Sequence, residues 1–394
     1  MQWSKLRSTS RWLPAYAAQC LRRPHRHRGP FHLVLALADH FEPAIVPGEG
    51  RRIAEHGEQE RRLEWWCREY PRTVQEWPDS DGRPFRHTYF YPAEQYEKSL
   101  IERLAEHCRA GLGEIEIHLH HGVEAPDTPE HTRRLLLKFR DNLFQHGCLS
   151  QRDGKGEPLY AFVHGNFALA NSANGQNCGV DSEMQILAET GCYADLTLPS
   201  APSISQISKI NALYECALPL DRRAPQRRGR DLQRGRTPQI YPLIIQGPLS
   251  LAFGWRRARR LGPRIENGAL TGLNPPTMDR LRQWRQADIT VRGRPEWVFV
   301  KLHCHGMDPR DKEALLGLTM RKFLRDLRTE VQDGREYKVH FVTAREMVNI
   351  ILAACDGREG NPGDYRDYLL KLVQLPGGVR SSTSMQDQTV DRVC

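Results

Sequence analysis

Histidines gather at three places where an apolar run of the sequence ends. Asp39 and His40 directly follow LVLALA, and the run EIEIHL carries His118 and is followed by His120. In parallel α/β folds, ligands bind at the carboxyl ends of the strands. Successive side chains of a strand alternate in direction, so His118 and His120 share one face about 7 Å apart. We therefore expect these two imidazoles to converge on one metal ion.

The first pair has two interpretations. Asp39 is suited to act as a general base or a metal ligand, and His40 as a ligand. The alternative is an aspartate that caps the turn beside a surface histidine.

The run WVFVKL ends in a third group, His303-Cys304-His305. His303 and His305 are expected to share a face, and one of them is a candidate general acid. A further contribution to a zinc site and a plain hydrogen-bonding role stay open. Cys304 should point away from the pair and is predicted to be a small buried residue.

A fourth strand end precedes the polar loop that contains NSANGQN. Here His164 and Asn166 are candidates for lining a substrate groove, where they would offer hydrogen bonds to hydroxyl or carbonyl oxygens. The alternative is a simple turn, which this composition also favours.

The elements that would position these residues alternate along the chain. Near-continuous apolar runs predict strands buried on both faces, at 31–38, 87–91, 114–119, 159–164, 239–245, 297–302 and 337–342. Helical periodicity lies between them, at 51–70, 93–110, 130–146, 181–190, 311–330 and 343–354. We expect Asp181 and Thr343 to cap the helices that follow them. The alternation predicts parallel βαβ units.

The order of these motifs resembles the metal-dependent polysaccharide deacetylases (the NodB-like family), within the glycoside hydrolase/deacetylase β/α-barrel superfamily. The resemblance covers about residues 31 to 354 and rests on Asp39-His40 after the first strand and on the stretch from Glu114 to His118. MQILAETGCYADLTL, WVFVKLHCHG and YKVHFVTAREMVN are similar to later segments of that family. The resemblance implies an α/β fold with an irregular barrel of about seven strands.

The same resemblance implies roles for single residues. Asp39 would be the general base, His118 a metal ligand and His303 the acid that protonates the leaving group. His40 stands where the family has a metal-binding Asp, and Gly122 stands where it has its second His. We therefore assign Asp39, His40, His118 and His120 to the metal, with His121 in reserve.

A further set of assignments concerns the substrate and the ion. The resemblance places His164 and Asn166 near the substrate loop of the family, and His305 is added to the substrate-binding residues. A His in place of an Asp makes the site softer, which favours zinc over magnesium or calcium as the divalent metal.

Composition limits the class of protein. The 394 residues are 27% charged and 39% hydrophobic, which is typical of a globular chain with a substantial core. Ten cysteines are scattered without a CxxC pair, so we expect reduced thiols. No apolar run is long enough for a signal peptide or a membrane span, which predicts a cytoplasmic location.

The formal net charge of +9 comes mostly from arginine clusters at 22–28, 222–236 and 256–260. These clusters lack interleaved aromatic residues, so we interpret them as solvated loops and do not expect a nucleic-acid partner. Contact with an anion or with nucleic acid is the alternative. The sequence leaves the oligomeric state open.

The predicted organisation has three parts. Residues 1–30 form a basic arm that we expect to be extended, and 31–354 form the barrel domain with an Arg/Pro-rich insertion near 215–280 that contains one strand. Residues 355–394 form a polar tail, which we expect to be disordered after Pro376.

Three functions are compatible with these features. The first is hydrolysis of acetyl groups on a glycan or glycan precursor. The second is a glycosidase that uses two carboxylates, such as Asp39 with Glu42 or Asp195. The third is a non-catalytic barrel that binds an anionic ligand.

Overall fold

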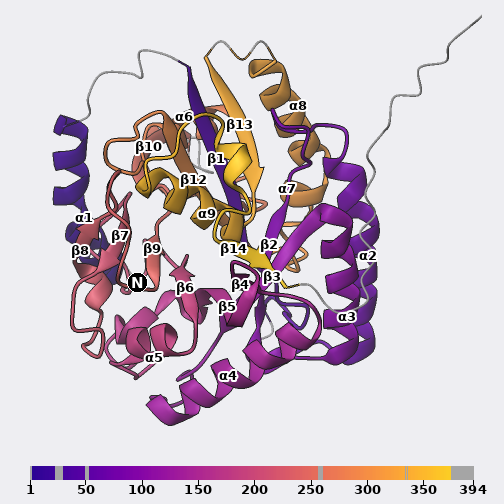
Figure 1. Ribbon diagram of the computed structural model, residues 1–394, viewed down its shortest axis with the longest axis vertical. Coiled ribbons are helices and arrows are strands. Elements are labelled where there is room, and N and C mark those ends of the chain that lie inside the picture. Colours follow the sequence, from indigo (N-terminus) through magenta and orange to yellow (C-terminus); the bar gives the residue numbers. More distant parts are fainter. Residues whose placement is uncertain are drawn as a thin grey trace, which may run out of the picture.

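The structure is a computed structural model that describes residues 2–22, 30–48, 53–255, 261–332, 334 and 336–373. Strands and helices alternate through most of the chain, as Figure 1 shows. The strands are β1 Phe31–His40, β2 His87–Pro92, β3 Gly113–Leu119, β4 Ser150–Arg152, β5 Lys155–His164, β6 Cys192–Asp195, β7 Leu213–Cys216, β8 Gly229–Asp231, β9 Leu243–Ile245, β10 Ser250–Trp255, β11 Leu261–Glu266, β12 Trp297–Cys304, β13 Tyr337–Val342 and β14 Leu370–Leu372.

The helices cover most of the linking segments. They are α1 Gln2–Arg22, α2 His56–Val74, α3 Lys98–His107, α4 Pro129–Gln145, α5 Glu183–Glu189, α6 Met278–Arg285, α7 Lys312–Leu316, α8 Leu318–Glu330 and α9 Ala344–Cys355. Short helical turns lie at η1 Ala93–Gln95, η2 Cys108–Leu112, η3 Gly165–Phe167, η4 Leu169–Asn171, η5 Pro225–Arg227 and η6 Pro362–Tyr365.

One large, mostly parallel sheet organises the fold. Its twelve strands include the path β12-β1-β2-β3-β5-β6-β9-β7-β8, and β13 pairs with the first half of β1. The pairs from β12 to β9 are parallel, whereas β7 and β8 are antiparallel additions. The carboxyl ends of the parallel strands therefore meet at one edge, as the sequence predicted.

The expected irregular barrel is not closed by hydrogen bonds. Within the described residues, no ladder joins β12 to β9. The two strands still approach each other, because Gly247, just after β9, lies so close to the Lys301 carbonyl of β12 that a side chain would not fit. The fold is thus a mixed α/β fold around a strongly curved sheet.

The two faces of the sheet bury different side chains, because direction alternates along each strand. On β1, Leu33, Leu35 and Leu37 pack in the cluster that contains the buried side chains of α2, α3, α4 and α8. Val34 and Ala36 pack instead with the side chains of α9. We call the side of the sheet that packs against α2, α3, α4 and α8 the outer face, and the side that packs against α9 the inner face.

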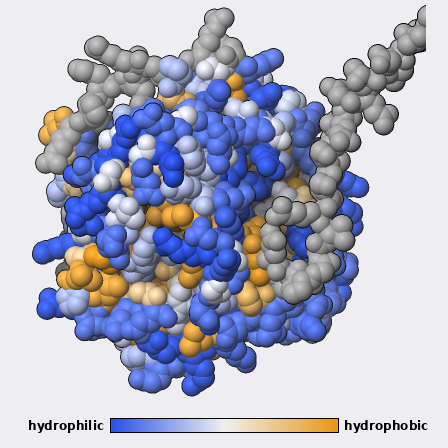
Figure 2. Space-filling model, viewed as in Figure 1, coloured by the Kyte–Doolittle hydropathy of each residue, from blue (hydrophilic) through white to orange (hydrophobic). Residues whose placement is uncertain are grey.

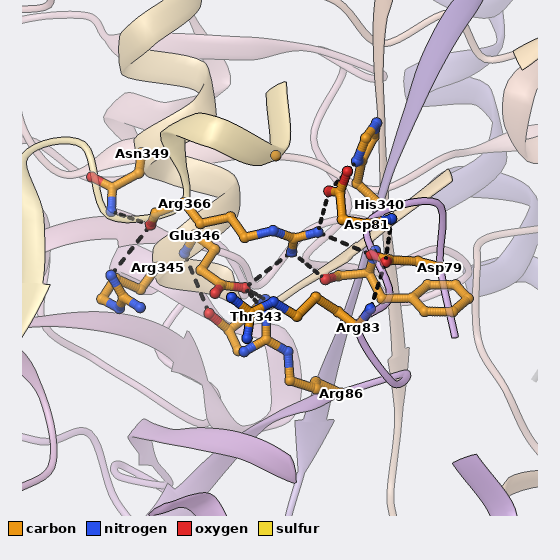
Figure 3. Close-up of polar contacts among 12 residues, drawn as sticks. Asp79, Asp81, Arg83, Arg86, His340, Thr343, Arg345, Glu346, Asn349 and Arg366 are labelled. Atoms are coloured by element: carbon orange, nitrogen blue, oxygen red, sulfur yellow. Dashed lines mark hydrogen bonds and ion pairs between the residues drawn. The ribbon is translucent and has the colours of Figure 1, made fainter. Parts of the chain in front are cut away.

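Helix α9 closes the amino-terminal end of the strands. Thr343 and Glu346 form the predicted cap as a capping box, and every residue of α9 is buried. Arg345 forms a bidentate pair with Glu114 of β3, with Nη2 and Oε1 2.7 Å apart. Figure 3 shows the adjoining contacts of Glu346 with Arg86 and Arg366. The opposite end of the strands, where the histidines lie, stays free of this helix.

Two predictions, on the amino-terminal arm and on the insertion, need correction. The expected extended arm is instead helix α1, whose Trp12 is buried with Ala201, Ile210 and Leu249. The insertion contains strands β8 to β11 and not a single strand. The start of the tail is ordered, because β14 pairs with β4. The disorder predicted after Pro376 lies outside the described residues.

A local correction concerns helix α5. The helix begins at Glu183 after Ser182, and Asp181 accepts a hydrogen bond from Asn171 instead of capping the first turn. Asp181 was predicted to be the cap because its type is favoured there. The loop before the helix offered it a different donor.

One face of the molecule is mainly polar. Figure 2 shows a largely hydrophilic face on which hydrophobic side chains gather in separate patches. All nine cysteines that the structure describes are free, as predicted, and most are buried. Among the described helices, none is both long enough and apolar enough to cross a membrane.

Candidate metal centre

Six polar side chains meet on the inner face at the carboxyl ends of β1, β3 and β12. We call them the inner-face cluster: His40, Glu42, His118, His120, His303 and His305. The ring centroids of His40 lie 4.8 Å from those of both His118 and His305, and those of His118 and His120 are 4.5 Å apart. The predicted convergence of His118 and His120 thus brings in four further groups.

His118 presents a free nitrogen to this cluster. Its Nδ1 lies 2.7 Å from the carbonyl oxygen of Val163, which can only accept, so Nδ1 carries the proton and Nε2 a lone pair. Nε2 is buried without a hydrogen-bond partner among the described residues, 3.4 Å from Glu42 Oε1. Two acceptors facing each other at this distance repel unless a cation lies between them.

His120 is oriented in the same way. Its Nδ1 lies 2.6 Å from Oε1 of Glu94, in the turn after β2, and its Nε2 is 3.7 Å from Glu42 Oε1. A carboxylate or carbonyl on Nδ1 is the usual support of a metal-binding histidine, because it fixes the tautomer and the ring. Glu42, His118 and His120 hold ligand atoms that all lie within 4.8 Å of one another.

The electrostatics favour neutral imidazoles at His40 and His118. Burial, together with the neighbouring histidines, lowers the pKa of His40 and of His118. At His120, burial alone would lower the pKa, but the contacts with Glu94 and Glu42 raise it. Burial alone would raise the pKa of Glu42, but its contacts with His118 and His120 lower it to about 2. Neutral histidines beside an ionised carboxylate are the protonation states that bind a divalent cation.

Asp39 does not join the cluster. It lies on the outer face, where its Oδ1 accepts a hydrogen bond from the Gly306 amide at 2.6 Å and its Oδ2 contacts His87 Nδ1 at 2.9 Å. Cys304 is buried beside it. Adjacent residues of a strand point to opposite faces, so Asp39 and His40 cannot both face one ion from β1.

His303 and His305 lie beside His40 on the far side from His118. The His303 ring centroid is 6.3 Å from that of His40, and its Nδ1 is buried without a partner among the described residues. Burial lowers the pKa of His303, and Lys301 adds to this effect. His305 and His120 are partly exposed, so the cluster reaches solvent on their side.

The two predicted groove residues are separated from this cluster. His164 points to the outer face, where it contacts His121 and Glu183, and Asn166 is exposed. The sequence did not identify Glu42 as a candidate metal ligand, or Glu94 as the carboxylate that orients His120. It also did not predict that His164 would contact His121 and Glu183 on the outer face. Glu42 offered one signal, because it lies two residues beyond His40.

Comparisons with known proteins add little to this geometry. No family model matches the chain, and no curated protein matches it. Among solved structures, the chain is similar to a crystal structure of a "putative polysaccharide deacetylase" from Mycobacterium smegmatis. The identity is 16% and the TM-score 0.42, over 84% of this chain and 93% of that chain.

Proposed function

We propose that the protein is a metal-dependent hydrolase that removes acetyl groups from a glycan or glycan precursor, with the inner-face cluster as its metal site. The observation that carries the proposal is the buried, unpartnered Nε2 of His118 opposite Glu42. Imidazole and carboxylate ligands suit zinc. The carbohydrate substrate and the cytoplasmic location stay predictions from the sequence.

The three proposed ligands are Glu42, His118 and His120. His40 adjoins His118 but is not counted among them. When bound, a divalent ion would polarise an acyl carbonyl and lower the pKa of a water molecule. Three protein ligands leave a position for substrate, and the partly exposed His120 lies on the open side. This arrangement supports a catalytic ion more than a purely structural one.

His303 and His305 are the proposed proton-transfer groups. His305 is partly exposed and adjoins His40, so it can take a proton from water on the substrate side. His303 stays the proposed acid for the departing amine or alkoxide. Because burial lowers its pKa, it would donate only after it has received the proton that is removed from water. For Asp39 we propose a positioning role, because it holds the amide of Gly306, the residue after His305.

The second candidate function, a glycosidase, requires two carboxylates at the glycosidic bond. Of the three predicted carboxylates, Glu42 alone belongs to the inner-face cluster. Asp39 lies on the outer face, and Asp195 is buried and accepts hydrogen bonds from Thr197. The geometry therefore favours the hydrolase with a metal ion.

The test is acetate release from acetylated sugars by the purified protein, with and without a chelator. We expect His118→Ala combined with His120→Ala to abolish zinc-dependent release and to lower zinc uptake by about one ion per chain, whereas the exposed control His56→Ala changes neither. Release that is unaffected by chelator and by the double substitution would exclude the proposal. Cleavage of a glycosidic bond without acetate would promote the glycosidase, and ligand binding without turnover the non-catalytic alternative.

A further inference from the structure

A second group of metal-binding residue types lies on the outer face of the sheet. We call it the outer-face cluster: His121 after β3, His164 at the end of β5, Cys178 in the following loop and Glu183 at the start of α5. All four residues are buried, and their ligand atoms lie within 4.8 Å of one another. This cluster is separate from the proposed hydrolase site and its interpretation does not depend on that function.

Both histidines of this cluster turn one nitrogen inward. Nδ1 of His121 contacts Oδ2 of Asp127 at 3.0 Å, and Nδ1 of His164 contacts the carbonyl oxygen of Gly165. Because each Nδ1 has an acceptor as partner, each Nε2 is left to face the centre of the cluster. The two Nε2 atoms are 3.1 Å apart.

The carboxylate and the thiol complete the group. Glu183 Oε1 lies 2.9 Å from His121 Nε2 and 3.4 Å from His164 Nε2, and Cys178 Sγ lies 3.6 Å from Glu183 Oε2. A tetrahedral zinc ion with bonds of about 2.0–2.3 Å holds its ligand atoms about 3.3–3.7 Å apart. Two of the observed separations, 3.4 Å and 3.6 Å, lie in this range, the second through Oε2 of Glu183, and the other two, 2.9 Å and 3.1 Å, are a few tenths of an ångström shorter.

We propose that His121, His164, Cys178 and Glu183 bind Zn²⁺ in a closed, four-ligand structural site. Thiolate and imidazole ligands select zinc over magnesium or calcium. Four protein ligands in a buried site leave no position for substrate, which is typical of structural zinc and not of catalytic zinc.

The surroundings of the cluster fit this role. Glu183 Oε2 accepts the Ala170 amide at 2.6 Å, and Cys178 Sγ accepts the Val180 amide at 3.5 Å. Gly122 has a φ of +62°, and the Cys178 backbone leaves no room for a side chain there. Each ligand that the loop contributes is thus fixed by a second contact.

The loop between the ligands has a strained backbone. Six of its non-glycine residues have positive φ: Asn166, Phe167, Ala170, Asn171, Asn174 and Asn177. Such conformations persist only when the surroundings enforce them. Phe167 also contacts His40, with ring centroids 5.7 Å apart. An ion that fixes this loop would therefore also fix one wall of the inner-face cluster.

The alternative to a zinc ion in the outer-face cluster is a second proton on His121. A doubly protonated His121 would donate from Nδ1 to Asp127 and from Nε2 to Glu183, and Cys178 would remain a buried thiol. The two occupants differ in one respect that can be measured: only the metal ion has the Cys178 sulfur as a ligand.

The experiment uses the full chain, dialysed against a chelator until its zinc content is constant. We expect about one zinc ion per chain to resist dialysis, because the buried site has no open position. Cys178→Ala should lose this ion. The matched controls Cys192→Ala, a buried thiol on β6, and Cys304→Ala, the thiol beside Asp39, should retain it.

A second measurement avoids the risk that Cys178→Ala does not fold. X-ray absorption of the dialysed wild-type protein should show one sulfur at about 2.3 Å and three nitrogen or oxygen ligands at about 2.0 Å from zinc. Cobalt in place of zinc should show a thiolate charge-transfer band. Retained zinc without a sulfur ligand, or a dialysed protein that neither holds nor takes up zinc, would overturn the proposal.

Discussion

Replacing Asp39 by Asn separates a positioning role from that of a general base. The carboxylate is fully buried and has two partners, the Gly306 amide and His87 Nδ1. Asn keeps one oxygen that can still accept from Gly306. Its NH₂ group would face His87, which must then move its proton to the other nitrogen. The fold around Gly306 should therefore survive the substitution.

The expected magnitudes follow from these two contacts. A hydrogen bond to an ionised group contributes about 1.5–3 kcal/mol, so Asp39→Asn should lower the free energy of unfolding by that amount. Because His305 keeps its place next to Gly306, acetate release should fall by less than about 10-fold. Loss of a true general base would reduce turnover by about 10²–10⁴-fold.

The assay compares kcat/KM and urea unfolding for Asp39→Asn, Asp39→Ala, His305→Ala and the double alanine variant. A positioning residue acts through its partner, so the double variant should be no slower than His305→Ala alone. A 100-fold or greater loss of turnover in Asp39→Asn, with unfolding in urea unchanged, would contradict a positioning role for Asp39.

Two further predictions concern buried charges away from the site. Burial raises the pKa of Glu116 from 4.5 to about 8, against the opposing hydrogen bond from Tyr193. The folded protein therefore keeps a proton that the unfolded chain releases, and stability should fall by about 1 kcal/mol per pH unit between pH 4.5 and 8. Urea unfolding of Glu116→Gln across this range should show a weaker decline, and a decline parallel to wild type would contradict the assignment. Arg345→Ala leaves Glu114 buried without its bidentate partner and should cost about 3–5 kcal/mol, part of which Glu114→Gln restores. A loss below about 1 kcal/mol in the single variant would show that the pair contributes little.

The sequence was sufficient for the parallel strands and for their shared edge. Strands β1 and β12 and the second half of β5 are near-continuous apolar runs, which is typical of strands buried on both faces, whereas β3 alternates apolar with polar residues. Short strands such as β8 lack such a run, because they are antiparallel additions with polar residues. This is why the insertion was assigned too few strands.

The site was predicted only in part, for a reason that the strands themselves explain. The alternation that correctly paired His118 with His120 also separates Asp39 from His40, and His164 from the inner face. Glu42 lies beyond the end of β1, where alternation no longer fixes the direction of a side chain.

The outer-face cluster had no comparable signal in the sequence. Cys178 and Glu183 lie in a loop and at a helix start, far along the chain from His121. No spacing in a strand or helix relates them, and only the folded loop brings them together.

The most direct test of the central claim is anomalous X-ray diffraction at the zinc edge from crystals of the zinc-loaded protein. We expect a peak about 2.0–2.2 Å from His118 Nε2 and from a Glu42 carboxylate oxygen. A zinc-loaded crystal with no peak between these two residues would contradict it, even if a peak is present at the outer-face cluster.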